Sequence, residues 1–210
     1  MFNVVTIARE YGSGGAEIGR KVAELLGWEC LDKQIIERAA SVEKAELCWA
    51  EEFDERSRTW WEKVMYGFEQ ASHTLAINSV MDYDSVQQST MRVIEEAAKV
   101  GNCVIIGRGS QFVLRSNPHV FHAMVYAPIA EKMDRIRIRH PHERNFRTFL
   151  TRMDIERSRY ERTYYDFDWR ERELYHLCLN STLGLDVCAE LIVTSLCTEQ
   201  CPNAMISSVA

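Results

Sequence analysis

A glycine-rich turn between a short apolar segment and an amphipathic segment constrains the fold of this chain more than any other feature. Residues 4–8 read VVTIA, a β-branched run that is typical of a buried strand. The glycine loop, residues 9–15, reads REYGSGG and contains three glycines. Gly27 ends a pattern of apolar residues at the spacing of one helix face, namely Ile18, Val22, Leu25 and Leu26. This order predicts a strand, a loop and a helix.

Such a turn favours phosphate binding, because glycines let backbone N–H groups converge on an anion and the helix N-terminus adds partial positive charge. The P-loop pattern is G-x-x-x-x-G-K-[ST], in which the lysine reaches the β- and γ-phosphates and the hydroxyl serves the metal. One alignment uses Gly14 and Gly19, with Arg20 at the lysine position. It would leave Ile18 outside the helix whose apolar face includes it.

A second alignment starts at Arg9, directly after the predicted strand. Gly14 is then the second glycine, Gly15 stands at the lysine position and Ala16 at the hydroxyl position. The helix periodicity favours this alignment, which means that the chain lacks the P-loop lysine. A purely structural strand–helix turn is the alternative, although so many glycines exceed what a turn requires, since glycine costs backbone entropy.

Strands alternate with helices along the rest of the chain. Residues 32–100 contain no proline and are mostly helical in pattern, with aromatic side chains that suit helix packing. Further strands are expected at 102–107, 120–127 and 174–180, and further helices at 129–139, 144–164 and 185–196. This alternation predicts an α/β fold with a mainly parallel sheet, which binds ligands at the carboxyl ends of its strands. One domain is expected over residues 1–197, and residues 198–210 are expected to fray.

Composition argues against several classes of protein. A net charge of −6 argues against a nucleic-acid binder. No apolar run approaches the roughly 18 to 20 residues that cross a bilayer, and no secretory signal is visible. The seven cysteines are scattered without a C-x-x-C pair, which argues against a zinc site or a disulfide framework. We therefore expect a cytoplasmic protein with reduced thiols, no metal ligand set, and no membrane or nucleic-acid partner.

Arginine is concentrated in one part of the chain. Of the 25 basic residues, 19 are Arg, and eleven of these fall within residues 135–172. A guanidinium presents a planar fork of donors that suits phosphate oxygens. Because Asp and Glu are interleaved in the same segment, a helix surface covered with ion pairs is an equal alternative for most of these arginines.

Several segments together resemble the cytidylate kinase-like family. Residues 9–19 read REYGSGGAEIG, nearly the whole of the family's loop signature R-E-Y-G-S-G-G-x-E-I-G. Residues 5–32 align without a gap to the N-terminus of bacterial cytidylate kinases. The resemblance covers most of residues 3–194 and is weakest at 42–101. Its later matches are Gly107-Arg108-Gly109 to a G-R-D motif, residues 125–136 to the strand and basic helix before the lid, Asp154-x-x-Arg157 to the lid's D-x-x-R, and residues 180–182 to D-T-[ST].

This resemblance implies a fold and an activity. The fold is a P-loop kinase-type three-layer α/β fold with a mainly parallel central sheet. It carries a helical insertion like a nucleoside monophosphate (NMP)-binding region at about 33–100 and a short Arg-rich lid at about 140–172. The activity is transfer of the ATP γ-phosphoryl group, with Mg²⁺, to CMP, dCMP or a related small phosphate acceptor.

The resemblance also assigns roles to residues. Asp32 would help to hold the acceptor nucleotide, and Arg108 would hold its phosphate. Arg157 and Arg152 would close onto the phosphates from the lid. The phosphate-binding loop would comprise Arg9, Tyr11, Gly12, Ser13, Gly14, Gly15, Ala16 and Glu17.

The missing lysine removes one charge that a P-loop aims at the β- and γ-phosphates. By analogy with oxyanion donors, such a loss costs roughly 10²- to 10³-fold in rate. Arg9, Arg135 or Arg139 could supply a replacement charge. Glu17 falls where cytidylate kinases place a loop threonine, and a carboxylate there repels phosphate unless a cation lies between them.

Other hypotheses remain open at this point. A binding module would hold a nucleotide or another anion and transfer nothing, in the role of a regulator. Self-association through the aromatic residues of 49–68, which would give a homo-oligomer, is a third hypothesis. Asp32 can equally be a helix N-cap, and Asp154 can pair with Arg157 on a helix surface.

Overall fold

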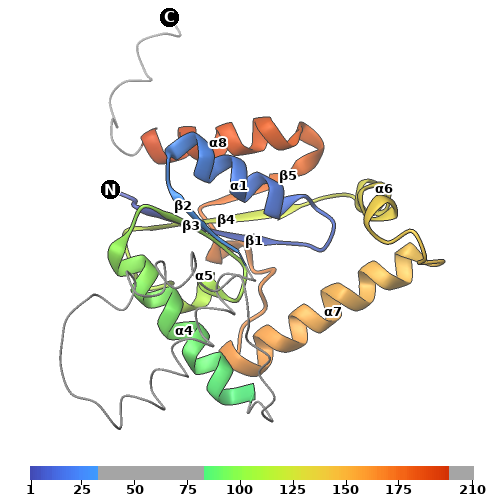
Figure 1. Cartoon of the computed structure of the whole chain (residues 1–210), viewed down its shortest axis with the longest axis horizontal. Helices are drawn as coiled ribbons and strands as arrows, with labels where there is room; N and C mark the ends of the chain where they lie inside the picture. Colours follow the sequence, from blue (N-terminus) through green and yellow to red (C-terminus); the bar gives the residue numbers. More distant parts are fainter. Residues whose placement is uncertain (33–82, 199–210) are drawn as a thin grey trace, which may run out of the picture.

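The computed structural model describes residues 1–32 and 83–198. Within them, a five-stranded, all-parallel sheet lies between two layers of helices (Figure 1). The strand order is β2-β3-β1-β4-β5, so β1 is central. The strands are β1 (Val4–Arg9), β2 (Glu29–Leu31), β3 (Cys103–Ile106), β4 (Val120–Tyr126) and β5 (Leu177–Asn180).

Helices cover both faces of the sheet. In Figure 1, α1 and α8 lie on one face, α4 and α5 lie on the other, and α6 and α7 lie at one end of the molecule. Two short 3₁₀ turns, η1 (Arg172–Leu174) and η2 (Ser181–Leu183), flank β5. The helices are α1 (Gly15–Leu26), α4 (Tyr83–Val100), α5 (Ser110–Val113), α6 (Ile129–Arg139), α7 (Phe146–Tyr165) and α8 (Leu185–Thr198).

Residues of β1 alternate between the two faces of the sheet, as the two-residue repeat of a strand requires. Val5 and Ile7 join an apolar cluster in which the sheet packs on α1 and α8. Val4 joins a second cluster, in which the other face packs on α4. Because both faces are covered, residues 4–7 have no exposed surface. The continuous β-branched run in the sequence is explained by this double burial.

The strand, loop and helix predicted at the start of the chain are confirmed. Helix α1 begins at Gly15 with Gly14 as its N-cap and ends at Gly27, so it follows the loop directly, as the second alignment requires. Ile18 is fully buried, as its place on the apolar face predicts. Leu25 was expected on the same face but is 56% exposed, since it lies in the last turn of α1.

The later elements also follow the sequence pattern, although α5 and η2 were not expected and β5 is shorter than expected. Helix α6 occupies residues 129–139 as expected. Strand β5 starts only at Leu177, whereas a strand was expected from residue 174. Residues 172–174 instead form η1, whose turn is closed by a bond from the Tyr175 amide to the Arg172 carbonyl at 3.0 Å.

Parts of the predicted organisation lie outside the described residues. Helix α4 agrees with the helical pattern predicted up to residue 100, but residues 33–82 and 199–210 are not described. The aromatic residues of 49–68 and the expected fraying of the tail therefore stay predictions, as does the division into domain, insertion and lid. Across the described ranges, no helix is both long and apolar enough to span a membrane.

Replacing a buried residue of α8 should reveal the contribution of this helix to the core. Ile192 is fully buried against the sheet, whereas its neighbour Leu191 is 39% exposed. We expect Ile192→Ala to lower the free energy of unfolding by about 2–5 kcal/mol, because it leaves a cavity. Leu191→Ala should change it by about 0.5 kcal/mol or less. Urea denaturation measures both, and equal losses would contradict the packing described.

Candidate functional site

The glycine loop lies at the carboxyl edge of the sheet, where the segments after β1, β3, β4 and β5 meet because the strands are parallel. The Glu10 amide donates to the carbonyl of Val125 on β4 at 3.0 Å. The amide and the hydroxyl of Ser13 both donate to the Glu10 carbonyl, at 3.3 and 2.9 Å. Gly12 and Gly14 have φ of 79° and 84°, in the left-handed region that favours glycine. The loop thus turns back tightly and presents the N-terminus of α1 at this edge.

A buried lysine ties the glycine loop to the two helices beside it. The side chain of Lys132 on α6 is 7% exposed, and its Nζ lies 3.1 Å from Glu10 Oε2 and 3.2 Å from Asp154 Oδ2. The same Glu10 oxygen accepts from the Ala127 amide at 3.2 Å. A charge buried this deeply is tolerated when it is paired and hydrogen-bonded. The Glu10 carboxylate, which would repel a phosphate if it were free, is thus neutralised by Lys132.

Asp154 and Arg157, the D-x-x-R pair of the sequence, hold the glycine loop from α7. Asp154 Oδ1 accepts from the amide of Tyr11 at 2.9 Å, and Arg157 donates to the carbonyl of Arg9. The two side chains therefore bind the loop backbone on either side of Glu10. The sequence also allowed Asp154 and Arg157 to pair with each other on the helix surface, but both side chains bind the loop backbone.

Two arginines of α6 bind the loop and the first turn of α1. The Arg135 guanidinium donates to the Ser13 carbonyl and to the Ser181 hydroxyl, both at 2.9 Å. Arg139 forms an ion pair with Glu17. Glu17 stands where cytidylate kinases carry a threonine, and its charge is balanced by this pair. The charges of Arg135 and Arg139 are thus directed at groups of the protein itself.

The side chain of Arg9 fills space that two glycines leave open. A Cβ on Gly15 would lie 2.5 Å from Arg9 Cβ and 3.0 Å from Arg9 Cγ. Further along, a Cβ on Gly107 would lie 1.4 Å from Arg9 Nη1. The guanidinium therefore extends from the end of β1 to the end of β3. Any larger residue at position 15 or 107 would displace it.

Three guanidinium groups line one small cavity at the carboxyl ends of β1 and β3. It has a volume of about 190 Å³ and is lined by Arg9, by Arg108 after β3, and by Arg157 from α7. Each guanidinium offers a planar fork of donors, so together they suit an anion with several oxygens. Other lining residues are Gln111, Met153, Glu156, Tyr160, Glu161 and Trp169.

Backbone strain marks Arg108. Its φ is 59°, and those of Gly107 and Gly109 are 74° and 69°. A non-glycine residue in this region costs about 1–3 kcal/mol and persists when its surroundings enforce it. Here the hydroxyl of Tyr165 donates to the Arg108 carbonyl at 3.1 Å, and a Cβ on Gly109 would lie 2.2 Å from the Tyr165 ring. Packing of Tyr165 thus explains why Gly109 replaces the Asp of the G-R-D motif.

A buried carboxyl group adjoins the three arginines. Glu161 on α7 is 5% exposed and accepts from Gln111 Nε2 at 3.3 Å. Burial raises the pKa of Glu161 to about 7, although Arg157 acts in the opposite direction. Burial, and then the charge of Arg157, lower the pKa of Arg9. The three arginine charges outweigh those of the two lining carboxylates, Glu156 and Glu161, so the cavity favours an anion.

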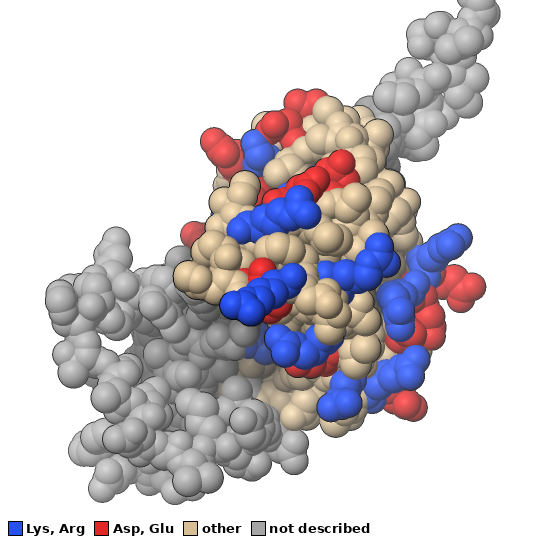
Figure 2. All heavy atoms as spheres, turned by 90° about the vertical axis from the view of Figure 1, so that its right-hand side faces the viewer, with Lys and Arg blue, Asp and Glu red and all other residues tan. Residues whose placement is uncertain are grey.

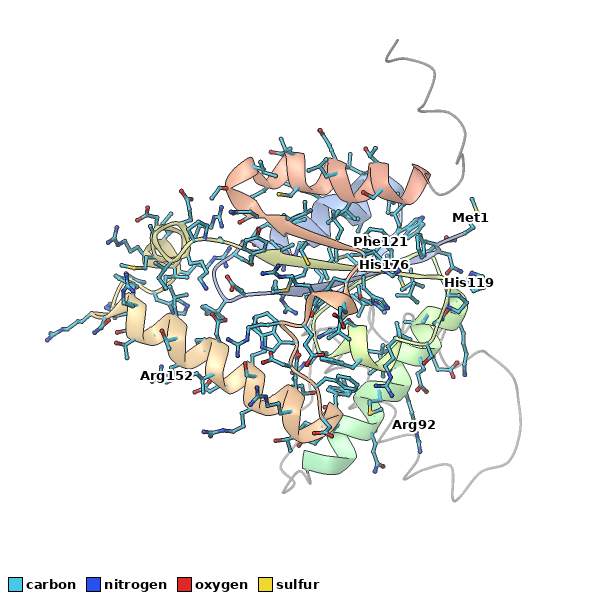
Figure 3. The ribbon with its side chains drawn as sticks, turned by 180° about the vertical axis from the view of Figure 1, so that it is seen from behind. Met1, Arg92, His119, Phe121, Arg152 and His176 are labelled. Atoms are coloured by element: carbon cyan, nitrogen blue, oxygen red, sulfur yellow. The ribbon has the colours of Figure 1, made fainter. Side chains whose placement is uncertain are left out.

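Two predicted site residues do not line this cavity, although the charge of Asp32 acts on Arg9. Asp32 follows β2 and forms an ion pair with Arg20 at 3.2 Å. Arg152 lies on the outer side of α7, where its side chain is 62% exposed and 3.9 Å from Glu156 (Figure 3). Neither contact excludes the predicted role, so acceptor binding by Asp32 and lid closure by Arg152 stay predictions.

Three of the remaining arginines follow the ion-pair alternative. Figure 2 shows Lys and Arg interspersed with Asp and Glu over the end of the molecule that faces right in Figure 1. Arg137 pairs with Asp134 at 2.7 Å, and Arg162 and Arg170 both pair with Asp168. The three arginine side chains are more than half exposed, so each pair contributes little to stability.

Sequence reasoning missed Lys132, Glu161 and Gln111. One feature of the sequence distinguishes Lys132. It is the sole lysine within residues 131–173, where all other Lys or Arg residues are arginines. Glu161 follows Arg157 by four residues and therefore lies on the same face of α7. Gln111 carried no comparable signal. Within the described ranges, no cluster of three or more His, Cys, Asp and Glu side chains could hold a metal ion.

A glycine loop between β1 and α1, the strand order and the Arg-lined cavity are features of P-loop kinases. The chain belongs to the cytidylate kinase-like family, whose sequence model matches residues 4–183. The family resemblance and the fold predicted from the sequence are thus confirmed. No functionally curated protein matches the chain.

Solved structures agree on the fold. An uncharacterized protein from Eubacterium ventriosum ATCC 27560 is similar at a TM-score of 0.65 with 18% identity, covering 92% of this chain and 97% of that one. The shikimate kinase from Acinetobacter baumannii, in complex with shikimate, gives a TM-score of 0.53 with 14% identity and 96% of both chains. A gluconokinase from Sinorhizobium meliloti 1021 gives 0.53 with 12% identity, covering 94% of this chain and 95% of that one. At these identities, the likeness concerns the fold alone.

Removing the buried lysine should destabilise the protein. Lys132→Met leaves Glu10 and Asp154 without their cation, and breaking a buried pair costs about 3–5 kcal/mol. Because these two carboxylates are 23% and 24% exposed, we expect a smaller loss of about 2–3 kcal/mol in the free energy of unfolding. Lys99→Met removes an exposed pair with Glu96 and serves as the control. Urea denaturation measures both, and similar small losses would contradict a supporting role for Lys132.

Glu161→Gln should change the pH dependence of stability. The pKa of Glu161 rises from 4.5 to about 7 on folding, so the protonated form stabilises the fold below the unfolded pKa. This contribution is lost as pH rises through 7. From pH 5 to pH 8, the wild type should lose about 2–3 kcal/mol relative to Glu161→Gln, at about 1.4 kcal/mol per pKa unit. Denaturation across this range, with the exposed Glu156→Gln as control, checks it. Parallel curves for wild type and Glu161→Gln would contradict the pKa shift.

Proposed function

We propose that this protein transfers the γ-phosphoryl group of ATP to a nucleoside monophosphate, of the CMP or dCMP kind, or to a related small phosphate acceptor. The observation that carries the proposal is the convergence of Arg9, Arg108 and Arg157 on one cavity beside the glycine loop. Membership of the cytidylate kinase-like family supports the donor and the type of reaction. The charge of the cavity supports an acceptor that carries phosphate, and the choice of CMP or dCMP comes from the family resemblance.

The arrangement fits the demands of phosphoryl transfer, which needs positioning and positive charge more than covalent participation. An oxygen of the acceptor phosphate attacks the γ-phosphorus and forms a new P–O bond. The bond from the γ-phosphorus to the bridging oxygen breaks, and ADP leaves with that electron pair. Arg108 and Arg157 would hold the acceptor phosphate, and the glycine loop would hold the phosphates of ATP. Arginines near the cavity stabilise the charge that spreads over the equatorial oxygens.

Mg²⁺ accompanies ATP in this class of reaction. Helix α1, which follows the glycine loop, carries one acidic residue in its first turn that could hold the ion. Mg²⁺ keeps several waters and takes one or two carboxylates besides substrate phosphates. Glu17, on the first turn of α1, supplies such a carboxylate in place of the usual hydroxyl. Bound Mg²⁺ would neutralise negative charge on the phosphate oxygens. Glu17 would face the ion and stay paired with Arg139.

Arg108→Gln should impair transfer to the acceptor. A charged hydrogen bond contributes about 1.5–3 kcal/mol, so we expect kcat/KM for the acceptor to fall about 10- to 150-fold. Arg115→Gln, which removes an exposed arginine stacked on Phe167, serves as the control and should leave the rate unchanged. ADP formation is measured with ATP, Mg²⁺ and a panel of nucleoside monophosphates.

The same panel separates the proposal from a binding module. ADP formation with one or more monophosphates, reduced in Arg108→Gln, would support a kinase. Stabilisation by ATP without ADP formation for any acceptor would favour a regulatory protein that binds nucleotide and transfers nothing. A change of thermal midpoint reports this binding, because ligand at about 100 Kd adds roughly 2.7 kcal/mol.

A further inference from the structure

We infer that Arg9 replaces the missing P-loop lysine. The cation that faces the β- and γ-phosphates then comes from the last residue of β1 and not from position 15, where the P-loop pattern has its lysine. This inference rests on the proposed function, because it assumes that the glycine loop binds ATP. The Arg9 guanidinium would supply the positive charge that is missing at position 15, where this chain has glycine.

The first support is steric. The lysine position of the pattern is residue 15, and its side chain would start from a Cβ only 2.5 Å from Arg9 Cβ. Real Cβ atoms essentially never approach other heavy atoms this closely. A lysine at 15 and the observed Arg9 side chain therefore exclude each other. The Arg9 stem occupies the start of the path that the lysine stem would take.

The second support is the end point of the side chain. The Arg9 guanidinium reaches over Gly107, and Arg9, Gly107 and Arg108 line the same cavity. This cavity adjoins the glycine loop at the carboxyl edge, where donor and acceptor phosphates have to meet for transfer. A guanidinium between them is placed where negative charge develops on the transferred group.

The third support is that the other cations near the loop bind groups of the protein itself. Arg135 donates to the Ser13 carbonyl and to the Ser181 hydroxyl, and Arg139 pairs with Glu17. Lys132 lies between two carboxylates. Arg9 lines the cavity, and the charges of Arg157, Glu161, Arg108 and Asp32 act on it. Of the three replacements considered from the sequence, the geometry selects Arg9.

A reciprocal exchange tests the inference. Arg9→Met keeps an unbranched side chain without charge, and it should weaken ATP binding about 10- to 150-fold, as loss of a charged hydrogen bond would. Gly15→Lys alone should weaken binding as well, because the new side chain collides with Arg9. The double variant Arg9→Gly/Gly15→Lys restores the order of the P-loop pattern and should bring the Kd for ATP back to within about 10-fold of wild type. Calorimetric titration with ATP and Mg²⁺ measures each Kd.

The rescue distinguishes a phosphate contact from a structural role. A lysine at position 15 restores charge but none of the packing of Arg9, so recovery in the double variant relative to Arg9→Gly supports the exchange. Unchanged ATP binding in Arg9→Met, or a double variant no better than Arg9→Gly, would overturn it. The inference would also be overturned if Arg9→Met changed only the KM of the acceptor and left the Kd for ATP unchanged. Thermal unfolding by circular dichroism verifies that each variant is folded at the titration temperature.

The outcome also separates this inference from the proposed function. ATP binding that depends on Arg9 and is rescued by Gly15→Lys, with no ADP formed from any acceptor, would refute transfer to a nucleotide and leave the role of Arg9 supported. Transfer that persists at the wild-type rate in Arg9→Met would refute the role of Arg9 and leave the proposed kinase activity supported. A wild-type protein that does not bind ATP would overturn both.

Discussion

The ammonium group of Lys132 is the point on which the arrangement of the site depends. It brings together Glu10 from the glycine loop and Asp154 from α7, residues 122 and 22 positions away from it along the chain. Asp154 in turn accepts from the amide of Tyr11, so the loop backbone and α7 share one anchor. Because α7 also carries Arg157 and Glu161, the wall of the cavity is placed relative to the loop through this cluster.

Arginines of this chain serve three different physical purposes, and their position relative to the sheet edge decides which. Arg9, Arg108 and Arg157 line the cavity at the carboxyl ends of β1 and β3. Arg135 and Arg139 bind the glycine loop and the first turn of α1. Farther out, Arg137 of α6 and Arg162 of α7 form ion pairs on the mixed surface of Figure 2. A high Arg content is therefore no measure of the number of phosphate contacts.

Elements defined by local patterns were predictable from the sequence. The β-branched run of residues 4–8 and the helical spacing from Ile18 depend on neighbours close in the chain, and the structure agrees with both. Contacts between distant segments were not predictable in this way. Nothing in the residues around Lys132 indicates that it meets Glu10, and nothing near Gly109 indicates that the Tyr165 ring lies against it. Such contacts are set by how helices cross the sheet edge, which no short pattern encodes.

One part of the molecule lies far from the site and shows that polar burial here is not always functional. His122 on β4 is 5% exposed, bonds to the Thr6 hydroxyl at 2.6 Å, and stacks with His176, which also stacks on Phe121. Figure 3 places Phe121 and His176 side by side, away from Arg152 and α7. Burial lowers the pKa of His122 to about 4, so this imidazole is neutral at physiological pH. It serves as packing between strands.

The mutual exclusion of side chains at positions 9, 15 and 107 has a consequence for how relatives of this protein diverge. A residue with a side chain at 15 or 107 cannot coexist with the present course of Arg9. A lysine at position 15 is therefore expected together with glycine at position 9, because any Cβ there would collide, whereas a side chain at position 107 requires only the end of the Arg9 side chain to move. Under the role inferred for Arg9, the loop carries one cation, which position 9 contributes in this chain and position 15 contributes in the P-loop pattern.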